Sequence, residues 1–375
     1  MSRKTRGSLI KPDEITIVHT VAKTVRNLFL LGGDLATQTH NAHRKDWILD
    51  IMEFQSSLMA IDLLGFSLMS NHIHQILRSR PDVVKKWDNL EVARRWLTLC
   101  PRSKKCLLVG DMVVRVPIAP KQTQIEALAN NKRRIKKIRE QLSSISWWMR
   151  LLCQKIAQRA NLEDGGSLGH FWKDRFHATV IEDDAHLLGC SFYVDLNAVK
   201  AAIAMGIEDY EYTSAKIRLD MIRAKQKAYE EQKAQEDQKA QEDQQDQGAE
   251  PPSAEASESI VDITKGEFLS VVKLDTLSGD PQLHKDGYRC SDKGFLEYSV
   301  KEYLEALEWC IRNKIIEPES KLPEQIPDCI KNHRLGPELV IKQAREFGKM
   351  YRYWAPKGSD SDQPESSSES SSQSG

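Results

Sequence analysis

The chain has 375 residues, 40% hydrophobic and 29% charged, which suits one sizeable core or one domain with appendages. Its net charge of zero conceals a basic segment at 121–159 and acidic segments at 230–258 and 359–375, and this asymmetry weakly favours nucleic acid as a partner. The sequence shows no signal peptide or apolar run of transmembrane length. Its seven scattered cysteines lack CxxC pairs and zinc spacing, so we expect a cytoplasmic, reduced protein without a membrane role.

The first third of the chain predicts a strand and a helix before a strand–turn–strand unit. Residues 15–21 favour a strand, and residues 43–52 favour a helix. Residues 60–69 and 72–77 read as two strands joined by the polar turn Ser70-Asn71.

The middle of the chain predicts a mostly helical, basic insertion at about 81–168, broken by Pro101 and by the stretch 117–120. Within it, residues 125–142 carry apolar side chains at helical spacing with basic residues between them, and a further helix runs from 143 to 160. After the insertion we expect a short strand at 176–181 and a helix from about 185 to 205.

The last third of the chain changes composition three times. Residues 224–286 form a low-complexity, partly helical linker with a repeated KAQEDQ unit, and the run 248–259 within it is expected to be disordered. Residues 287–356 return to globular composition and predict a small helical unit. The Ser-rich acidic tail at 357–375 is expected to be disordered.

The pair His72 and His74 is the first candidate for chemistry. Side chains at i and i+2 share one face of a strand, so the two imidazoles should converge while Ile73 and Gln75 point away. Two neutral imidazoles provide half of a site for a divalent metal. A His-x-His pair also arises by chance in sheets that bind nothing, and that alternative stays open for the pair alone.

Tyr193 is the second candidate, because a tyrosine beside such a metal is a nucleophile that can attack a phosphodiester. Asn197 follows one helical turn later on the same face, where Gly189 leaves space before the tyrosine and Lys200 offers a cation to a phosphate. The alternative for Tyr193 is an ordinary half-buried aromatic, and for Asn197 a surface amide. Histidines and tyrosine together suggest an enzyme that nicks single-stranded DNA and becomes covalently attached to it.

Basic side chains predict contacts with the phosphate backbone, which Lys and Arg neutralise without reading sequence. Arg175 lies between the basic segment and Tyr193 and could bind phosphate or fix a loop. A basic helix is equally often a solvated surface. The candidates for DNA binding are Lys132, Arg133, Lys136, Arg139, Arg175 and Lys200.

Five blocks in this order resemble the IS200-like single-tyrosine (HUH) transposases, and most of all the related transposases associated with repetitive extragenic palindromes. The blocks are FLLG with HRKDW, MSNHIH, SSISW, GHFWKDRF and YVDLNAVKA, and together they cover roughly residues 10–210. The C-terminal unit resembles the extension of longer members of this family.

The resemblance implies a ferredoxin-like α/β (α+β) fold, with an antiparallel sheet that carries the histidines and a nearby helix that carries the tyrosine. It implies Mg²⁺ or Mn²⁺ held by His72, His74 and Asn197, and attack by Tyr193 on single-stranded or hairpin DNA to give a 5′-phosphotyrosine link and a free 3′-hydroxyl. The third ligand is often Gln in the smallest members, whereas this chain has Asn197. A homodimer and a place at the bacterial nucleoid agree with the family.

Two other functions stay open at this stage. The first is a domesticated protein that keeps the fold and binds structured nucleic acid without cleaving it. The second is a metal-dependent phosphoesterase that uses the two histidines without a covalent step, and that would survive loss of Tyr193 but fail without His72.

Overall fold

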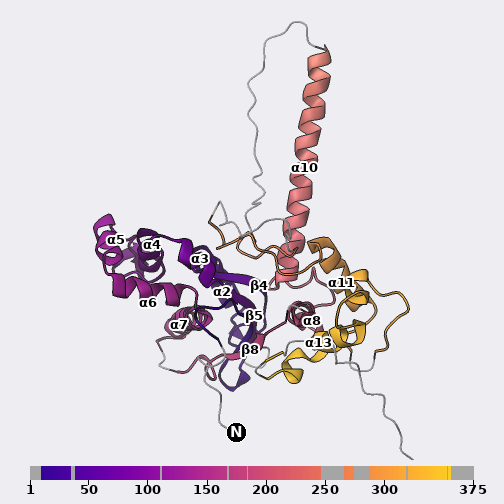
Figure 1. Ribbon diagram of the computed structural model, residues 1–375, viewed down its shortest axis with the longest axis horizontal. Helices are drawn as coiled ribbons and strands as arrows, with labels where there is room; N and C mark the ends of the chain where they lie inside the picture. Colours follow the sequence, from indigo (N-terminus) through magenta and orange to yellow (C-terminus); the bar gives the residue numbers. More distant parts are fainter. Residues whose placement is uncertain are drawn as a thin grey trace, which may run out of the picture.

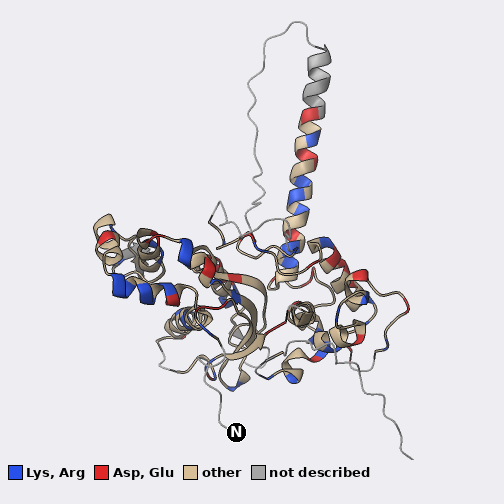
Figure 2. Ribbon diagram, viewed as in Figure 1, with Lys and Arg blue, Asp and Glu red and all other residues tan. Residues whose placement is uncertain are grey.

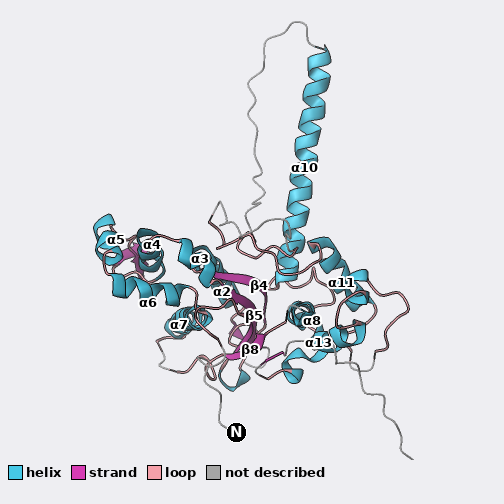
Figure 3. Cartoon of the chain, viewed as in Figure 1, coloured by secondary structure: helices cyan, strands magenta, loops and turns pink. Residues whose placement is uncertain are grey.

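The structure is a computed structural model in which the chain has a mixed α/β fold, with a sheet at its centre and helices around it (Figure 3). The described residues are 10–34, 39–109, 112–166, 169–183, 185–245, 266–273, 287–317, 320–352 and 354–355. The segments expected to be disordered, 248–259 and 357–375, lie outside these ranges.

The central sheet has the order β4-β5-β1-β8-β9. Its first four strands are antiparallel, and they are β1 (Ile17–Lys23), β4 (Ile61–Leu68), β5 (His72–Ser79) and β8 (His177–Ile181). With helix α2 (Arg44–Leu58) after β1 and helix α7 (Ile145–Glu163) before β8, the chain follows the β-α-β-β-α-β path of ferredoxin-like folds. The predicted fold class is therefore confirmed.

Different helices cover the two faces of the sheet. On β5, Gln75 faces α7, where its side-chain oxygen accepts a hydrogen bond from Trp148 Nε1 at 2.9 Å. Because successive side chains alternate along a strand, His74 and Ile76 lie on the other face, towards α8 (Ala185–Asp195). Figure 1 shows α7 and α8 on opposite sides of the sheet. Both faces are covered, so every residue of β4 is buried.

The insertion after β5 packs on the α7 side of the sheet. Its helices are α3 (Pro81–Lys86), α4 (Asn89–Leu99), α5 (Gln122–Ala129) and α6 (Lys132–Leu142). Asn131 caps the N-terminus of α6, because its side chain accepts a hydrogen bond from Arg134 N, and the helix buries Ile135 and Ile138 on one face.

One part of the insertion differs from the prediction of a mostly helical segment. Strands β6 (Lys104–Val109) and β7 (Met112–Pro117) form an antiparallel hairpin there. The reason is local composition, since residues 112–117 include three valines, and β-branched side chains favour strands.

The helix predicted for 185–205 is also interrupted. α8 ends at Asp195, a short α9 (Asn197–Lys200) follows, and Ala202 has a left-handed φ of 54°. The buried Asp195 accepts hydrogen bonds from Tyr303 Oη at 2.6 Å and from Ser214 Oγ and Ala215 N at 2.5 and 3.1 Å. The bonds from Ser214 and Ala215 tie the end of α8 to the start of α10 (Ser214–Gln245), whose distal part extends away from the body (Figure 1).

The C-terminal residues share a core with the sheet. Their elements are α11 (Val300–Arg312), α12 (Asp328–Lys331), α13 (Pro337–Met350) and β9 (Trp354–Ala355). β9 adds to the central sheet beside β8 in parallel, and α13 packs along α8. The small helical unit predicted from composition is thus built onto the α8 side of the ferredoxin-like sheet.

Candidate functional site

Four aromatic side chains from three elements meet between the sheet and α8. His72 and His74 lie on one face of β5, as predicted, with ring centroids 4.9 Å apart. The centroid of the Tyr193 ring, from α8, lies 5.6 Å from that of His74 and 5.8 Å from that of His19 in β1. The fold therefore brings the predicted histidines and tyrosine together, although more than a hundred residues separate His74 from Tyr193 in the chain.

His72 is held by the residue before it. Its Nδ1 lies 2.6 Å from Asn71 Oδ1, and Asn71 Nδ2 donates to the carbonyl of Asn27 at 3.2 Å. Because a carbonyl only accepts, the Asn71 amide is oriented with its oxygen towards His72. His72 therefore carries its proton on Nδ1, which leaves the lone pair of Nε2 free.

The ring of His74 is held by His19, a residue to which the sequence analysis gave no role. His74 Nδ1 lies 2.9 Å from Nε2 of His19, and the two rings are parallel within 3°. Both side chains are buried, at 4% and 1% exposure. One proton lies between these two nitrogens, so the tautomer of one ring fixes the tautomer of the other.

The histidines are neutral at physiological pH. Burial, with a smaller effect of nearby Lys23, lowers the pKa of His72 to about 4. Burial also lowers the pKa of His19 to about 3, and that of His74 falls well below its usual value for the same reason. Neutral imidazole is the form that binds metal ions.

Tyr193 is half-buried beneath the C-terminal helix. Its ring stacks under Lys200, whose Nζ lies 3.7 Å from the ring centroid and donates to the carbonyl of Ala344 in α13 at 3.2 Å. The Phe347 ring of α13 lies 6.2 Å away. A Cβ on Gly348 would lie 2.9 Å from the phenol oxygen, so a larger residue here would require Tyr193 or α13 to shift. Burial, with Cys190 nearby, raises the pKa of the Tyr193 phenol.

Asn197 lies at the start of α9, beside the turn that precedes His72. The next residue, Ala198, packs against Met69, whose backbone N–H donates to the carbonyl of His72 at 2.8 Å. The Asn197 side chain is partly buried, and its Nδ2 has no hydrogen-bond partner in the described part of the chain. The Asn197 amide nitrogen therefore has no partner among the described residues.

These side chains fit a divalent cation with nitrogen and oxygen ligands. Among the described residues, no group of three His, Cys, Asp or Glu side chains is arranged to hold a metal. One imidazole nitrogen each from His72 and His74, with the amide oxygen of Asn197, would supply three donors, and a substrate oxygen could complete the set.

Gly189 differs from its predicted role. The space at this glycine is not left open for the tyrosine, because Gln343 of α13 fills it, with its Cβ 2.6 Å from where a Gly189 Cβ would lie. Gln343 is fully buried there and bonds to His186 Nδ1 of α8. Gly189 thus allows close packing of α8 and α13.

The basic residues of α6 are separated from Tyr193 by the sheet. Lys132, Arg133 and Lys136 are exposed, and Figure 2 shows the basic side of α6 far from α8. Arg139 instead donates to the carbonyls of Val84 and Trp87, which ties α6 to the neighbouring helices. Of the other candidates, Arg175 is exposed near the start of β8, and Lys200 lies against Tyr193.

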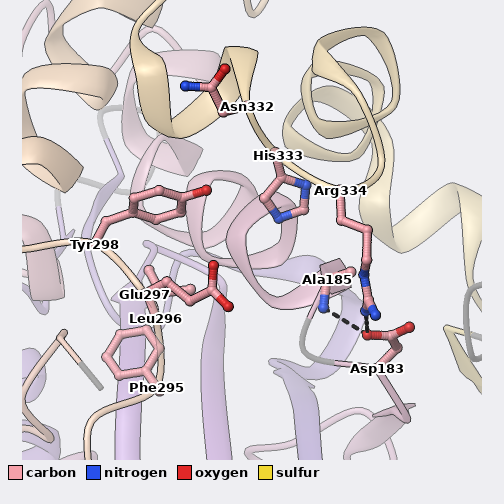
Figure 4. A pocket seen from close by; sticks show the side chains of 9 residues that line it. All are labelled: Asp183, Ala185, Phe295, Leu296, Glu297, Tyr298, Asn332, His333 and Arg334. Carbon is pink, nitrogen blue, oxygen red and sulfur yellow. Dashed lines mark hydrogen bonds and ion pairs between the residues drawn. The ribbon is translucent and has the colours of Figure 1, made fainter. Parts of the chain in front are cut away.

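A separate cavity of about 510 Å³ opens at the N-terminal end of α8 (Figure 4). It is lined by Asp183, Ala185 and the segments 295–298 and 332–334. Arg334 forms an ion pair with Asp183, which also accepts a hydrogen bond from Ala185 N at 2.9 Å. None of the predicted site residues lines this cavity.

Two features of the site were missed in the sequence analysis. His19 has a recognisable signal, since in a ferredoxin-like sheet the first strand pairs with the third, which here carries His72 and His74. The covering of Tyr193 by α13 has no signal in the sequence, because it depends on a contact between helices that lie far apart in the chain.

None of the helices in the described residues has both the length and the apolar character needed to cross a membrane. Comparisons of the chain with protein families, with curated proteins and with solved structures give no match.

Proposed function

We propose that the protein is a metal-dependent enzyme that cleaves and rejoins single-stranded hairpin DNA through a covalent link to Tyr193. The observation that carries the proposal is that the ring centroids of Tyr193 and His74 lie 5.6 Å apart. The resemblance to IS200-like transposases in five ordered blocks supports the same chemistry. We further propose that the protein acts in the cytoplasm and that two copies can cooperate as a homodimer.

His72, His74 and Asn197 would hold Mg²⁺ or Mn²⁺, which when bound polarises the phosphate and stabilises the charge that develops on its oxygens. The histidines are suited to this role because they are neutral and because His72 keeps a free lone pair on Nε2. Asn197 would contribute its amide oxygen.

Tyr193 would act as the nucleophile. Its phenol oxygen would release its proton and form a bond to phosphorus while the bond from phosphorus to the 3′ oxygen breaks, and the departing oxygen takes up a proton to become a 3′-hydroxyl. The 5′ phosphate stays on the tyrosine until another 3′-hydroxyl attacks it, which rejoins the strands and releases Tyr193. Each step exchanges one phosphoester bond for another, so no external source of energy is needed.

Lys200 would hold the phosphate beside Tyr193. Burial and the nearby Lys349 lower the pKa of Lys200 to about 7, although Cys190 and Glu346 oppose this shift. A phosphate in contact with Nζ would favour the charged ammonium and raise that pKa again. Lys132, Arg133 and Lys136 of α6 face solvent elsewhere and would contact more distant parts of the DNA.

A covalent adduct tests the proposal. The full chain is incubated with a single-stranded hairpin and Mn²⁺, and adducts are separated on a denaturing gel. Wild type should form an adduct and Tyr193→Phe should not, whereas Tyr229→Phe, which changes a 70% exposed tyrosine on α10, should behave as wild type. Cleavage without an adduct in Tyr193→Phe would favour a phosphoesterase instead.

A second candidate function is binding of structured nucleic acid without cleavage. The observation that favours it is the position of α13, since Gly348 lies against the Tyr193 oxygen and Phe347 against its ring. Cleavage requires this helix to move away from Tyr193, whereas binding elsewhere on the protein does not. Hairpin binding that persists with no adduct under any divalent metal would support this alternative.

A further inference from the structure

We propose that Asn71 and His19 are positioning residues that set both histidines of β5 in the Nδ1-protonated form and aim their Nε2 lone pairs at one cation. The inference rests on the proposed function, because it concerns the same site. It assigns roles to two residues that do not themselves contact the cation or the DNA.

The contact at His72 carries the first half of the argument. The amide of Asn71 is oriented by its bond to the Asn27 carbonyl, so the oxygen that faces His72 Nδ1 can only accept. The Asn71 backbone is fixed as well, because its carbonyl accepts from both Thr24 N and Thr24 Oγ1 at 2.9 Å. The acceptor is therefore in place before any cation binds.

The contact at His74 carries the second half. Nδ1 of His74 and Nε2 of His19 share one proton at 2.9 Å, and only one arrangement leaves His74 able to bind a cation through Nε2. In that arrangement His74 donates from Nδ1, and His19 accepts while keeping its own proton on Nδ1. If His19 donated instead, the proton of neutral His74 would occupy Nε2 and block it.

The position of His19 makes this contact rigid. His19 lies in the middle of β1, opposite Ile76 of β5 on one side and Thr179 of β8 on the other. The rings of Phe347 and Tyr193 each lie 5.8 Å from its ring, nearly perpendicular to it. A residue so placed can orient the His74 ring, which is what outer partners of metal-binding histidines do.

The first test reads the tautomers directly. In the metal-free full chain labelled with ¹⁵N at histidine, long-range ¹H–¹⁵N spectra distinguish Nδ1-H from Nε2-H imidazoles. We expect the Nδ1-H pattern for both His72 and His74. An Nε2-H pattern for either residue in the folded wild type would overturn the assignment for that pair.

The second test measures binding of Mn²⁺ alone by the loss of the free-ion signal in electron paramagnetic resonance. His19→Leu and Asn71→Ala remove the acceptor and should weaken binding by about 10- to 100-fold. His19→Gln and Asn71→Asp keep an acceptor oxygen and should each stay within about threefold of wild type. A merely structural role for His19 would not produce this rescue by Gln.

The outcomes separate the two proposals. If wild type binds no Mn²⁺, the proposed function fails at its cation, while the spectra still decide the tautomers. If wild type binds Mn²⁺ and the acceptor-free variants bind it equally well, the inference about Asn71 and His19 fails while the proposed function stands. If a variant does not fold, the wild-type spectra decide for its residue.

Discussion

Burial suppresses positive charge around Tyr193. It lowers the pKa of Lys200 to about 7 and that of His19 to about 3, and it raises the pKa of the phenol itself. A negatively charged phosphate entering this region favours protonation of the basic groups that it meets. Binding of a phosphodiester should therefore be linked to uptake of protons.

Lys200→Met should change how the free energy of unfolding depends on pH. The unfolded chain keeps this lysine protonated up to about pH 10.5, whereas the folded chain releases the proton near pH 7. Because the unfolded state binds more protons in this window, Lys200 makes stability rise with pH there. The variant lacks this contribution, which is on the order of 5 kcal/mol over the whole window.

Urea unfolding at about pH 6 and about pH 9.5 measures the effect. The stability of Lys200→Met relative to wild type should be higher at the lower pH and should decrease at the higher pH. Lys301→Met changes an exposed lysine of α11 and serves as the control. A difference between wild type and Lys200→Met that is equal at both pH values would contradict the lowered pKa.

At the scale of elements, the packing of α13 on α8 determines how Tyr193 is presented. The two helices approach closely at two glycines, Gly189 against Gln343 and Gly348 against Tyr193. Lys200 adds a hydrogen bond from α9 to the α13 backbone. Tyr193 thus lies at a helix pair whose separation controls the exposure of its phenol.

Gly189→Ala should loosen this helix pair. Its new Cβ would lie 2.6 Å from the Cβ of Gln343, so α13 has to shift, and overpacking of this kind costs about 1–3 kcal/mol. Gly206→Ala is the matched control, because its Cβ would meet the nearest atom, Asp209 Oδ2, at 3.6 Å. Thermal unfolding compares the two variants, and equal transition temperatures would refute the close packing.

At the scale of the whole molecule, the C-terminal residues are joined to the sheet by a buried charge cluster. Asp62 of β4 accepts from Arg78 Nε at 2.8 Å and from Arg80 Nη1 at 3.0 Å, and all three side chains are buried. Arg78 also donates to the carbonyls of Lys293 and Gly294, and Asp62 accepts from Ser291 Oγ. This cluster connects β4 and β5 to the segment before α11.

Asp62→Asn should therefore destabilise the entire fold. The change leaves two buried guanidinium groups without their shared carboxylate, and breaking a buried ion pair in this way costs about 3–5 kcal/mol. Glu305→Gln removes the partner of an exposed ion pair with Lys301 and should cost less than about 1 kcal/mol. Urea unfolding followed by circular dichroism measures both, and a similar small cost for the two variants would argue against the cluster.

The strands of the sheet could be predicted from the sequence because their signal is local. Residues 15–21, 60–77 and 176–181 alternate or carry β-branched side chains, and the structure has strands at all three places. The same alternation placed His72 and His74 on one face. The β6–β7 hairpin was missed because its valines lie between helical segments, and the whole insertion was predicted to be mostly helical.

Long-range contacts could not be predicted in the same way. The hydrogen bond between His19 and His74 requires the pairing of β1 with β5, and no single segment encodes it. The approach of Gly348 to Tyr193 depends on how α13 returns to α8 after the linker. The composition of residues 287–356 indicated a folded unit, but not the side of the sheet on which that unit packs.

The most direct measurement of the central claim is the identification of the residue that becomes attached to DNA. After incubation of wild type with a single-stranded hairpin and Mn²⁺, nuclease trimming and peptide mass spectrometry should locate a 5′-phosphonucleotide on Tyr193. We expect this modification in wild type and its disappearance in His74→Ala. Attachment to a different residue, or an undiminished adduct in Tyr193→Phe, would contradict it.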